Sequence, residues 1–189
     1  GTQEVVGTTF IDDCQWDRRA EYVAAAGWTH NAANGYYSNT YYRTLFTKGK
    51  YGDGTYEFRF HPIASPTSPG LCGMHVPFFS QVASTSFVDS TSWEGASYFL
   101  DIKAGSKIVA INYNNGLGGG NSVVSYFGAF TFASAIGSVG TSTKFRLEIS
   151  GNVARLFAND VEAINTVTLT KGLTEGYFGF CSKYATTAG

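Results

Sequence analysis

Aromatic and amide side chains are concentrated in one stretch of the chain, GWTHNAANGYYSNTYYR, at positions 27–43. Trp28, Tyr36 and Tyr41 are its main candidates for stacking on the apolar face of a sugar ring. The amides and hydroxyls around them suit hydrogen bonds to sugar hydroxyls. These residue types predict a carbohydrate-binding surface. The structural alternative is an edge strand whose aromatic side chains alternate between core and surface.

Two further segments offer groups for recognition. Trp93 stands at the start of an expected strand, as a second stacking platform or as a tryptophan buried in a sheet core. The glycine-rich loop NYNNGLGGGN carries Asn112, Tyr113 and Asn115, which suit either ligand recognition or an ordinary solvated turn. Both interpretations stay open for each segment.

A third set of residues has the types that a uronate lyase needs, namely Arg or Asn to neutralise a carboxylate and His or Tyr to move protons. All lie on strands expected to be neighbours, but alternation alone does not place them on one face. The set comprises Arg59, His61, His75, Asn112, Tyr113 and Tyr126. In the structural alternative, which we favour, Arg59 pairs with an acid and His75 sits in a satisfied hydrogen bond. Arg59 and His75 also count as carbohydrate-binding candidates.

The strand signals that must position these residues recur along the whole chain. TYEFRFHPI, positions 55–63, alternates Tyr56, Phe58 and Phe60 with polar side chains, a period of two that sends the two sets to opposite faces. Eight later segments are similarly rich in β-branched or aromatic residues, so nine or more strands are expected. Only residues 16–27 have a helical composition, enough for one short helix or turn.

Turn residues favour an antiparallel arrangement. Gly151-Asn152 and Asn159-Asp160 flank the strand segment ARLF, and both pairs accept a positive φ at little cost. Adjacent strands therefore pair as hairpins. We expect an all-β fold, an antiparallel β-sandwich with two sheets packed face to face.

Composition limits the class of protein further. The 189 residues suit a single domain covering 1–189, and only 14% of them are charged, with a net charge of −1. No basic cluster points to nucleic acid, and no apolar run is long enough for a transmembrane segment. The three cysteines are not spaced as zinc ligands are; they are Cys14, Cys72 and Cys181. Two states stay open for them, a Cys14–Cys181 disulfide or three reduced thiols.

The order of the segments resembles the concanavalin A-like lectin and glucanase superfamily, laminarinase-type domains in particular. The resemblance spans most of the chain and implies a concanavalin A-like jelly roll. It rests on TTFIDDCQW, TKGKYGDGTYEFRFH, STSWEGASYFLDI, KFRLEISGNVARLFANDVEA and EGYFGFCSK. Members of that superfamily often hold a structural calcium ion where terminal strands meet, which implicates Asp12 or Asp13. Asx-turn hydrogen bonds are the alternative for aspartates in turns.

The sequence departs from that family at the catalytic strand. Laminarinase-type enzymes carry E-x-D-x-x-E there, because retaining hydrolysis needs two carboxyl groups about 5 Å apart on one face. This chain has WEGASYFLDIK instead. Glu94 and Asp101 are seven positions apart, and an odd offset puts them on opposite faces of a regular strand. A catalytic pair would need acids from other strands, such as Glu57 or Glu148.

We therefore expect a non-catalytic, lectin-like domain that recognises a poly- or oligosaccharide by stacking and hydrogen bonding. We expect the domain to be part of a larger adhesion or fibre-tip protein. Its expected location is extracellular or on a cell surface, or on the virion surface if the parent protein is a phage fibre. Two alternatives stay open. One is a polysaccharide lyase or atypical glycoside hydrolase, and the other is a structural fibre-tip module, in a homo-trimer, that binds a protein partner.

Overall fold

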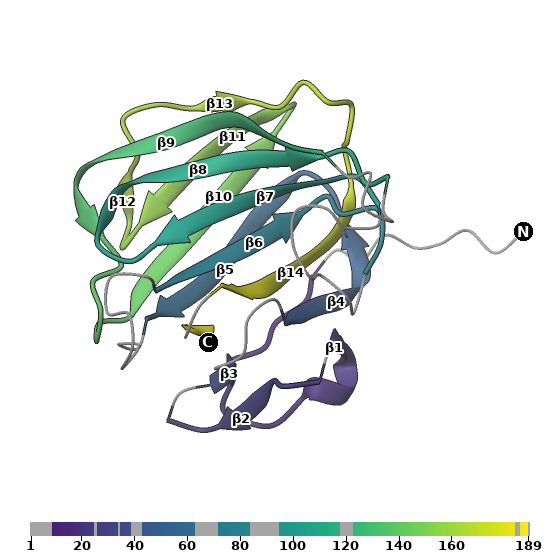
Figure 1. Ribbon diagram of the computed structural model, residues 1–189, viewed down its shortest axis with the longest axis vertical. Helices are drawn as coiled ribbons and strands as arrows, with labels where there is room; N and C mark the ends of the chain where they lie inside the picture. The colour runs from purple at the N-terminus through teal and green to yellow at the C-terminus, as the bar shows by residue number, and fades with distance from the viewer. Residues whose placement is uncertain are drawn as a thin grey trace, which may run out of the picture.

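The computed structural model describes residues 9–24, 26–33, 35–38, 43–62, 72–83, 95–117, 123–183 and 186–188. Within these ranges the chain forms two antiparallel sheets that pack face to face as a β-sandwich (Figure 1). The helical structure there is one turn of 3₁₀ helix, η1 (Arg19–Glu21), and the described helices include none long and apolar enough to span a membrane.

The two sheets are called sheet A and sheet B. Sheet A has seven strands in the order β1 (Tyr22–Ala24), β4 (Thr44–Tyr51), β14 (Gly176–Lys183), β6 (Gly73–Phe78), β7 (Ser97–Lys103), β8 (Ser106–Asn114) and β9 (Val124–Ile136). Sheet B has the order β12 (Val161–Glu162), β11 (Val153–Ala158), β10 (Thr143–Ser150), β5 (Gly54–His61), β15 (Thr186–Ala188), β3 (Gly35–Ser38) and β2 (Thr29–Asn31), with β13 (Val167–Thr168) paired to β11.

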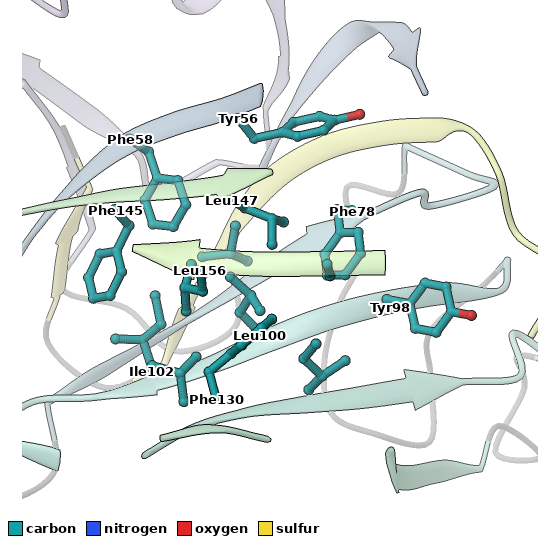
Figure 2. Packing of buried hydrophobic residues seen from close by; sticks show 14 of the residues in the cluster. Tyr56, Phe58, Phe78, Tyr98, Leu100, Ile102, Phe130, Phe145, Leu147 and Leu156 are labelled. Atoms are coloured by element: carbon teal, nitrogen blue, oxygen red, sulfur yellow. The ribbon is translucent and has the colours of Figure 1, made fainter. Parts of the chain in front are cut away.

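The core lies between the sheets and is rich in aromatic rings (Figure 2). The predicted alternation in β5 is confirmed, because Tyr56, Phe58 and Phe60 are buried in this core while Glu57 and Arg59 are exposed on the other side of the strand. Strand β10 repeats the pattern against it in register. The period-2 sequence pattern therefore assigns the inner and outer faces of sheet B correctly.

The predicted hairpin turns are present. Gly151 and Asn152 have φ values of 54° and 66° and join β10 to β11, and Asn159 and Asp160, at 48° and 64°, join β11 to β12. Positive φ at both central residues matches the right-handed twist of paired strands. Glycine and asparagine are the residues that tolerate this conformation best.

The structure decides three alternatives that the sequence left open. Within residues 16–27, expected to hold one short helix or turn, the chain forms the single turn η1 and then β1, where Tyr22–Ala24 pair with Leu45–Thr47 of β4. Residues 27–43 supply β2 and β3, and β2 is the last strand in the order of sheet B, as the edge-strand alternative predicted. All three cysteines are free, which matches the reduced-thiol alternative.

Candidate functional site

The outer face of sheet A, the face turned away from sheet B, carries an aromatic and polar cluster. Strands β6, β7 and β8 send Met74, Leu100 and Ile111 into the core, so the residues between the core positions point outward. Cross-strand pairing joins those outward residues into two rows. One row is Cys181, His75, Asp101, Ala110 and Ala129, and the other is Pro77, Phe99, Asn112 and Tyr126.

An irregularity in β9 brings Tyr126 onto this face. Ala110 pairs with Ala129 and Ile111 with Gly128, so a regular ladder would place Phe127 opposite Asn112. The register shifts instead, and Tyr126 takes that place. Phe127 packs on the inner side, with its ring centroid 5.4 Å from that of Tyr98. An extra residue of this kind is a β-bulge, which re-aims the side chains that follow it.

Tyr126 and Asn112 are both available to a ligand. The Tyr126 side chain is 70% exposed, and Asn112 is partly exposed directly opposite. Neither side chain makes a hydrogen bond within the part of the chain that the structure describes. The next pair along the two strands is Ala110 and Ala129, whose small side chains leave space beside the tyrosine ring. An open aromatic ring beside an amide suits stacking combined with hydrogen bonding.

The other half of the same face is buried. The His75 and Phe99 rings are in contact in a tilted arrangement, with centroids 4.8 Å apart, and the His75 Nε2 atom lies 3.6 Å from an Asp101 carboxylate oxygen. Both rings are almost fully buried, and so are Phe46 and Cys181, which form a small second cluster on β4 and β14. The open part of the face is therefore its β8–β9 side, with Asp101 at the boundary.

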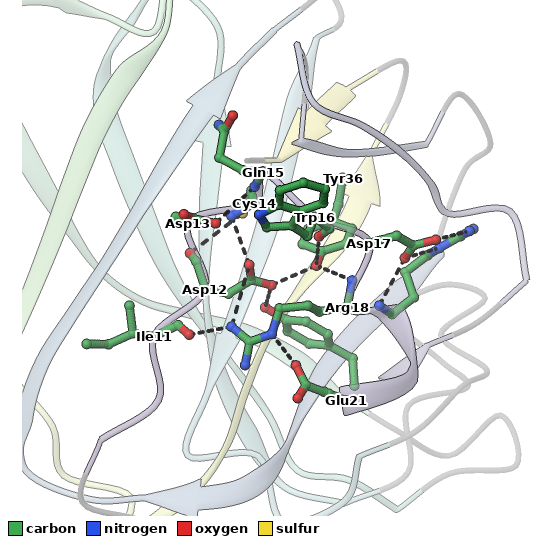
Figure 3. A network of polar contacts seen from close by, with 12 residues as sticks. Ile11, Asp12, Asp13, Cys14, Gln15, Trp16, Asp17, Arg18, Glu21 and Tyr36 are labelled. Atoms are coloured by element: carbon green, nitrogen blue, oxygen red, sulfur yellow. Dashed lines mark hydrogen bonds and ion pairs between the residues drawn. The ribbon is translucent and has the colours of Figure 1, made fainter.

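A second polar cluster surrounds Asp12 in the N-terminal segment (Figure 3). The Asp12 carboxylate accepts hydrogen bonds from the Tyr22 and Tyr36 hydroxyls, at 2.8 and 2.7 Å, and from the backbone N–H of Cys14 at 2.8 Å. Arg18 Nη1 lies 3.8 Å away and donates to the Ile11 carbonyl. These contacts fasten residues 11–18 to β1 and β3.

The charges in this cluster follow from its contacts. Burial disfavours ionisation of Asp12, but the hydrogen bonds from Tyr36, Cys14 and Tyr22, with the Arg18 charge, outweigh it and lower the pKa of the carboxyl group. Burial and the bond to Asp12 raise the pKa of both tyrosines above their usual range. Asp12 is thus a carboxylate whose oxygens are already occupied by protein donors.

The calcium site implied by the sequence resemblance does not fit these residues. Both Asp12 oxygens accept protein hydrogen bonds, and Asp13 accepts one from the Gln15 backbone N–H at 3.1 Å. Across the described ranges, no three His, Cys, Asp or Glu side chains gather as a metal site would require. The local bonds of Asp12 and Asp13 are Asx turns, the alternative that the sequence left open.

A pocket of about 340 Å³ opens beside this cluster, between the edge of β5 and sheet A. Here it is called the lateral pocket. It brings together five candidate residues named from the sequence, Asp12, Asp13, Tyr36, Glu57 and Arg59. Its walls include Leu45, Phe58, Phe178 and Phe180 from β4, β5 and β14. The lateral pocket is therefore apolar inside and charged at its rim.

The remaining candidates are dispersed. Trp28 is 3% exposed in the core, so its ring is not open to stacking, and Tyr36 is equally buried. Tyr113 faces inward against Tyr98. The Asn115 side-chain oxygen accepts hydrogen bonds from the backbone N–H groups of Leu117 and Val123. Tyr41, Trp93 and Glu94 lie outside the described residues, so the Glu94–Asp101 spacing stays a sequence argument.

The lyase set is divided between the two sheets. His75, Asn112 and Tyr126 share the outer face of sheet A, whereas Arg59 points outward from sheet B on the far side of the core. Arg59 therefore cannot act on a carboxylate held beside His75. On sheet B, the Glu148 carboxylate lies in ion pairs with Arg146 at 3.0 Å and with Arg155 at 3.4 Å.

Sequence reasoning overlooked one exposed aromatic ring. Trp16 is 77% exposed in the N-terminal segment, between Gln15 and Asp17. An exposed tryptophan flanked by polar residues is a stacking candidate on its own. Its sequence signal was the isolated aromatic in the polar stretch DDCQWDRR.

No protein-family model and no curated protein matches the chain. Solved structures do. The carbohydrate-binding module CBM66 from Bacillus subtilis superposes with a TM-score of 0.64, covering 88% of this chain and 90% of that one at 16% identity. A legume lectin-like domain from Entamoeba histolytica gives a TM-score of 0.59 at 9% identity and covers 95% of each chain.

A similar enzyme structure is the kappa-carrageenase from Pseudoalteromonas carrageenovora in complex with an oligotetrasaccharide of kappa-carrageenan. It has a TM-score of 0.55 at 7% identity, over 94% of this chain and 78% of that one. At such identities a structural likeness describes the fold and not the activity. The two antiparallel sheets, together with these likenesses, show that the protein has the concanavalin A-like lectin and glucanase fold.

Proposed function

We propose that this domain binds a glycan without cleaving it, on the β8–β9 side of the outer face of sheet A. The observation that carries the proposal is the direct opposition of Tyr126 and Asn112, an exposed ring and an amide with no hydrogen bond to a described residue. Binding modules and lectins among proteins of the same fold support the same class of ligand.

The binding mechanism needs no covalent chemistry. The Tyr126 ring stacks on the apolar face of a pyranose or furanose ring, and the Asn112 amide donates to and accepts from its hydroxyls. Ala110 and Ala129 give the sugar room to lie flat on the sheet.

A glycan array followed by calorimetric titration of each hit tests the proposal. We expect Tyr126→Ala to weaken binding by about 1–2 kcal/mol, roughly 5- to 30-fold in Kd. Tyr126→Phe should bind nearly as well as the unmodified protein, because stacking uses the ring and not the hydroxyl. An array without any hit would remove the proposed function.

Two matched variants locate the site. Val161→Ala removes another exposed apolar side chain, 62% exposed, from β12 at the edge of sheet B and should leave binding unchanged. Trp16→Ala removes the exposed tryptophan of the N-terminal segment. If Trp16→Ala abolished binding while Tyr126→Ala bound normally, the glycan site would lie at the N-terminal segment and not on sheet A.

A further inference from the structure

The lateral pocket exists because strand β5 has one incompletely paired edge. On one side β10 pairs with β5 from Gly54 to Phe60, whereas on the other side the pairs among the described residues join β15 to Phe60 and His61 only. The residues before Phe60 therefore border an opening into the sandwich. Leu45, Phe58, Phe178 and Phe180 line it with aliphatic and aromatic groups. A volume of about 340 Å³ lies within the range of small-molecule sites, roughly 300–1,000 Å³.

Two positive charges face each other at the rim of this pocket. Arg59 on β5 and Lys144 on β10 are cross-strand partners on the outer face of sheet B. Like charges directly opposite each other destabilise a sheet unless an anion lies between or beside them. Lys144 is paired with Asp160 at 3.1 Å, whereas the Arg59 side chain is exposed and makes no ion pair or hydrogen bond with any described residue.

Carboxylates lie around the pocket as well, but none of those described forms an ion pair with Arg59. The Asp12 carboxylate accepts hydrogen bonds from Tyr22 and Tyr36, lies 3.8 Å from Arg18, and is only 3% exposed. Glu57 and Asp13 lie at the rim as well, on the outer face of β5 and in the N-terminal segment. Arg59 thus remains a guanidinium with five N–H donors beside an apolar opening.

We infer that the lateral pocket binds a small amphipathic anion, with its apolar body against Phe58, Phe178 and Phe180 and its anionic group on Arg59 and Lys144. A carboxylate, sulfonate or sulfate group suits the planar guanidinium, which forms two parallel hydrogen bonds with such oxygens. This site is separate from Tyr126, because Arg59 and Tyr126 lie on the outer faces of different sheets. It does not depend on the proposed glycan binding.

The fluorescent dye 8-anilinonaphthalene-1-sulfonate has the required aromatic body and single anionic group, and its emission increases in an apolar site. We expect saturable binding to the folded protein, with near-ultraviolet circular dichroism showing that the fold is retained. Arg59→Gln should raise the dye Kd about tenfold, the loss expected for one charge-assisted hydrogen bond. Arg59→Lys should give a Kd between those of the original protein and Arg59→Gln, because the charge remains but the two parallel hydrogen bonds of the guanidinium are lost.

Two controls make the test specific to this pocket. Lys107→Gln removes an equally exposed cation from β8 and should leave the dye Kd unchanged, as should Tyr126→Ala on the glycan face. Decanoate should displace the dye, and decyltrimethylammonium should not. The inference is overturned by equal dye affinity in Arg59→Gln, by equal displacement with the cationic amphiphile, or by absence of saturable binding to the folded protein.

Discussion

At the scale of single residues, Asp12 links three separate parts of the chain. Its carboxylate accepts hydrogen bonds from Tyr22 of β1, from Tyr36 of β3 and from the Cys14 backbone, although β1 and β3 belong to different sheets. A buried carboxylate bonded in this way is stabilising only while it is ionised and its donors are present. We therefore infer that the Asp12 carboxylate holds the N-terminal segment, β1 and β3 together at the open side of the sandwich.

Replacing this carboxylate should cost stability in a pH-dependent way. We expect Asp12→Asn to lower the free energy of unfolding at pH 7 by about 1–3 kcal/mol, because it removes a charged acceptor from buried donors. The pKa of Asp12 is lowered in the folded state, so its stabilisation is complete above the unfolded value of about 3.9 and is lost as the pH falls through the folded pKa. Urea unfolding of both proteins between pH 7 and pH 3 measures the difference.

The neighbouring Asp13 supplies the matched control. It is exposed, and its side chain accepts a single local hydrogen bond that an asparagine oxygen can also accept. Asp13→Asn should therefore change the free energy of unfolding by no more than about 0.5 kcal/mol. Equal effects of the two substitutions on the free energy of unfolding would show that the Asp12 carboxylate does not hold these segments together. A stability loss in Asp12→Asn that does not shrink in acid would show the same.

At the scale of elements, the β10–β11 hairpin depends on its two-residue turn. Asn152 has a φ of 66°, which asparagine and glycine accept but a β-branched residue does not. We expect Asn152→Val to lower the free energy of unfolding by about 1–2 kcal/mol, measured by urea denaturation. Asn152→Gly keeps the positive φ accessible and should stay within about 1 kcal/mol of the unmodified protein. Similar losses in both variants would refute the backbone explanation.

Strand faces were predictable from sequence wherever the alternation continued unbroken. In β5 and β10 every second residue is apolar, and the structure buries those residues. In β9, Phe130 and Phe132 are buried, and Tyr126 stands an even number of positions before both. Unbroken alternation would therefore place Tyr126 on the inner side. The bulge at Phe127 reverses that assignment, and its only sequence signal is Gly128, because a glycine within a strand often marks a bulge.

The candidate site was predictable in its residue types and not in its assembly. His75 and Asn112 were selected from sequence and share one face, but Arg59 lies on the opposite sheet, a separation that only the topology determines. Trp28 and Tyr36 have suitable side chains, yet the edge hairpin of β2 and β3 turns both into buried positions. Composition gives the chemistry of such residues, whereas register and burial decide which of them a ligand meets.

At the scale of the whole molecule, burial in separate parts of the sandwich limits access to the thiols. Cys72 and Cys181 are almost fully buried. Cys14 is partly exposed, but burial and the nearby Asp12 and Asp13 raise the pKa of its thiol to about 11. A thiol reacts as its thiolate, so at neutral pH burial protects two cysteines and a high pKa protects the third.

Cysteine labelling therefore reports on the whole fold. With excess maleimide at pH 7, we expect slow labelling of the native protein and rapid addition of three labels in concentrated guanidinium chloride without reductant, counted by mass spectrometry. Raising the pH toward 9 should accelerate one native label only, and Cys14→Ser should eliminate that label, because deprotonation of Cys14 does not require unfolding. A single label in the unfolded, unreduced protein would instead reveal a disulfide. Rapid labelling of two or more native thiols would mean that the core opens far more readily than its burial implies.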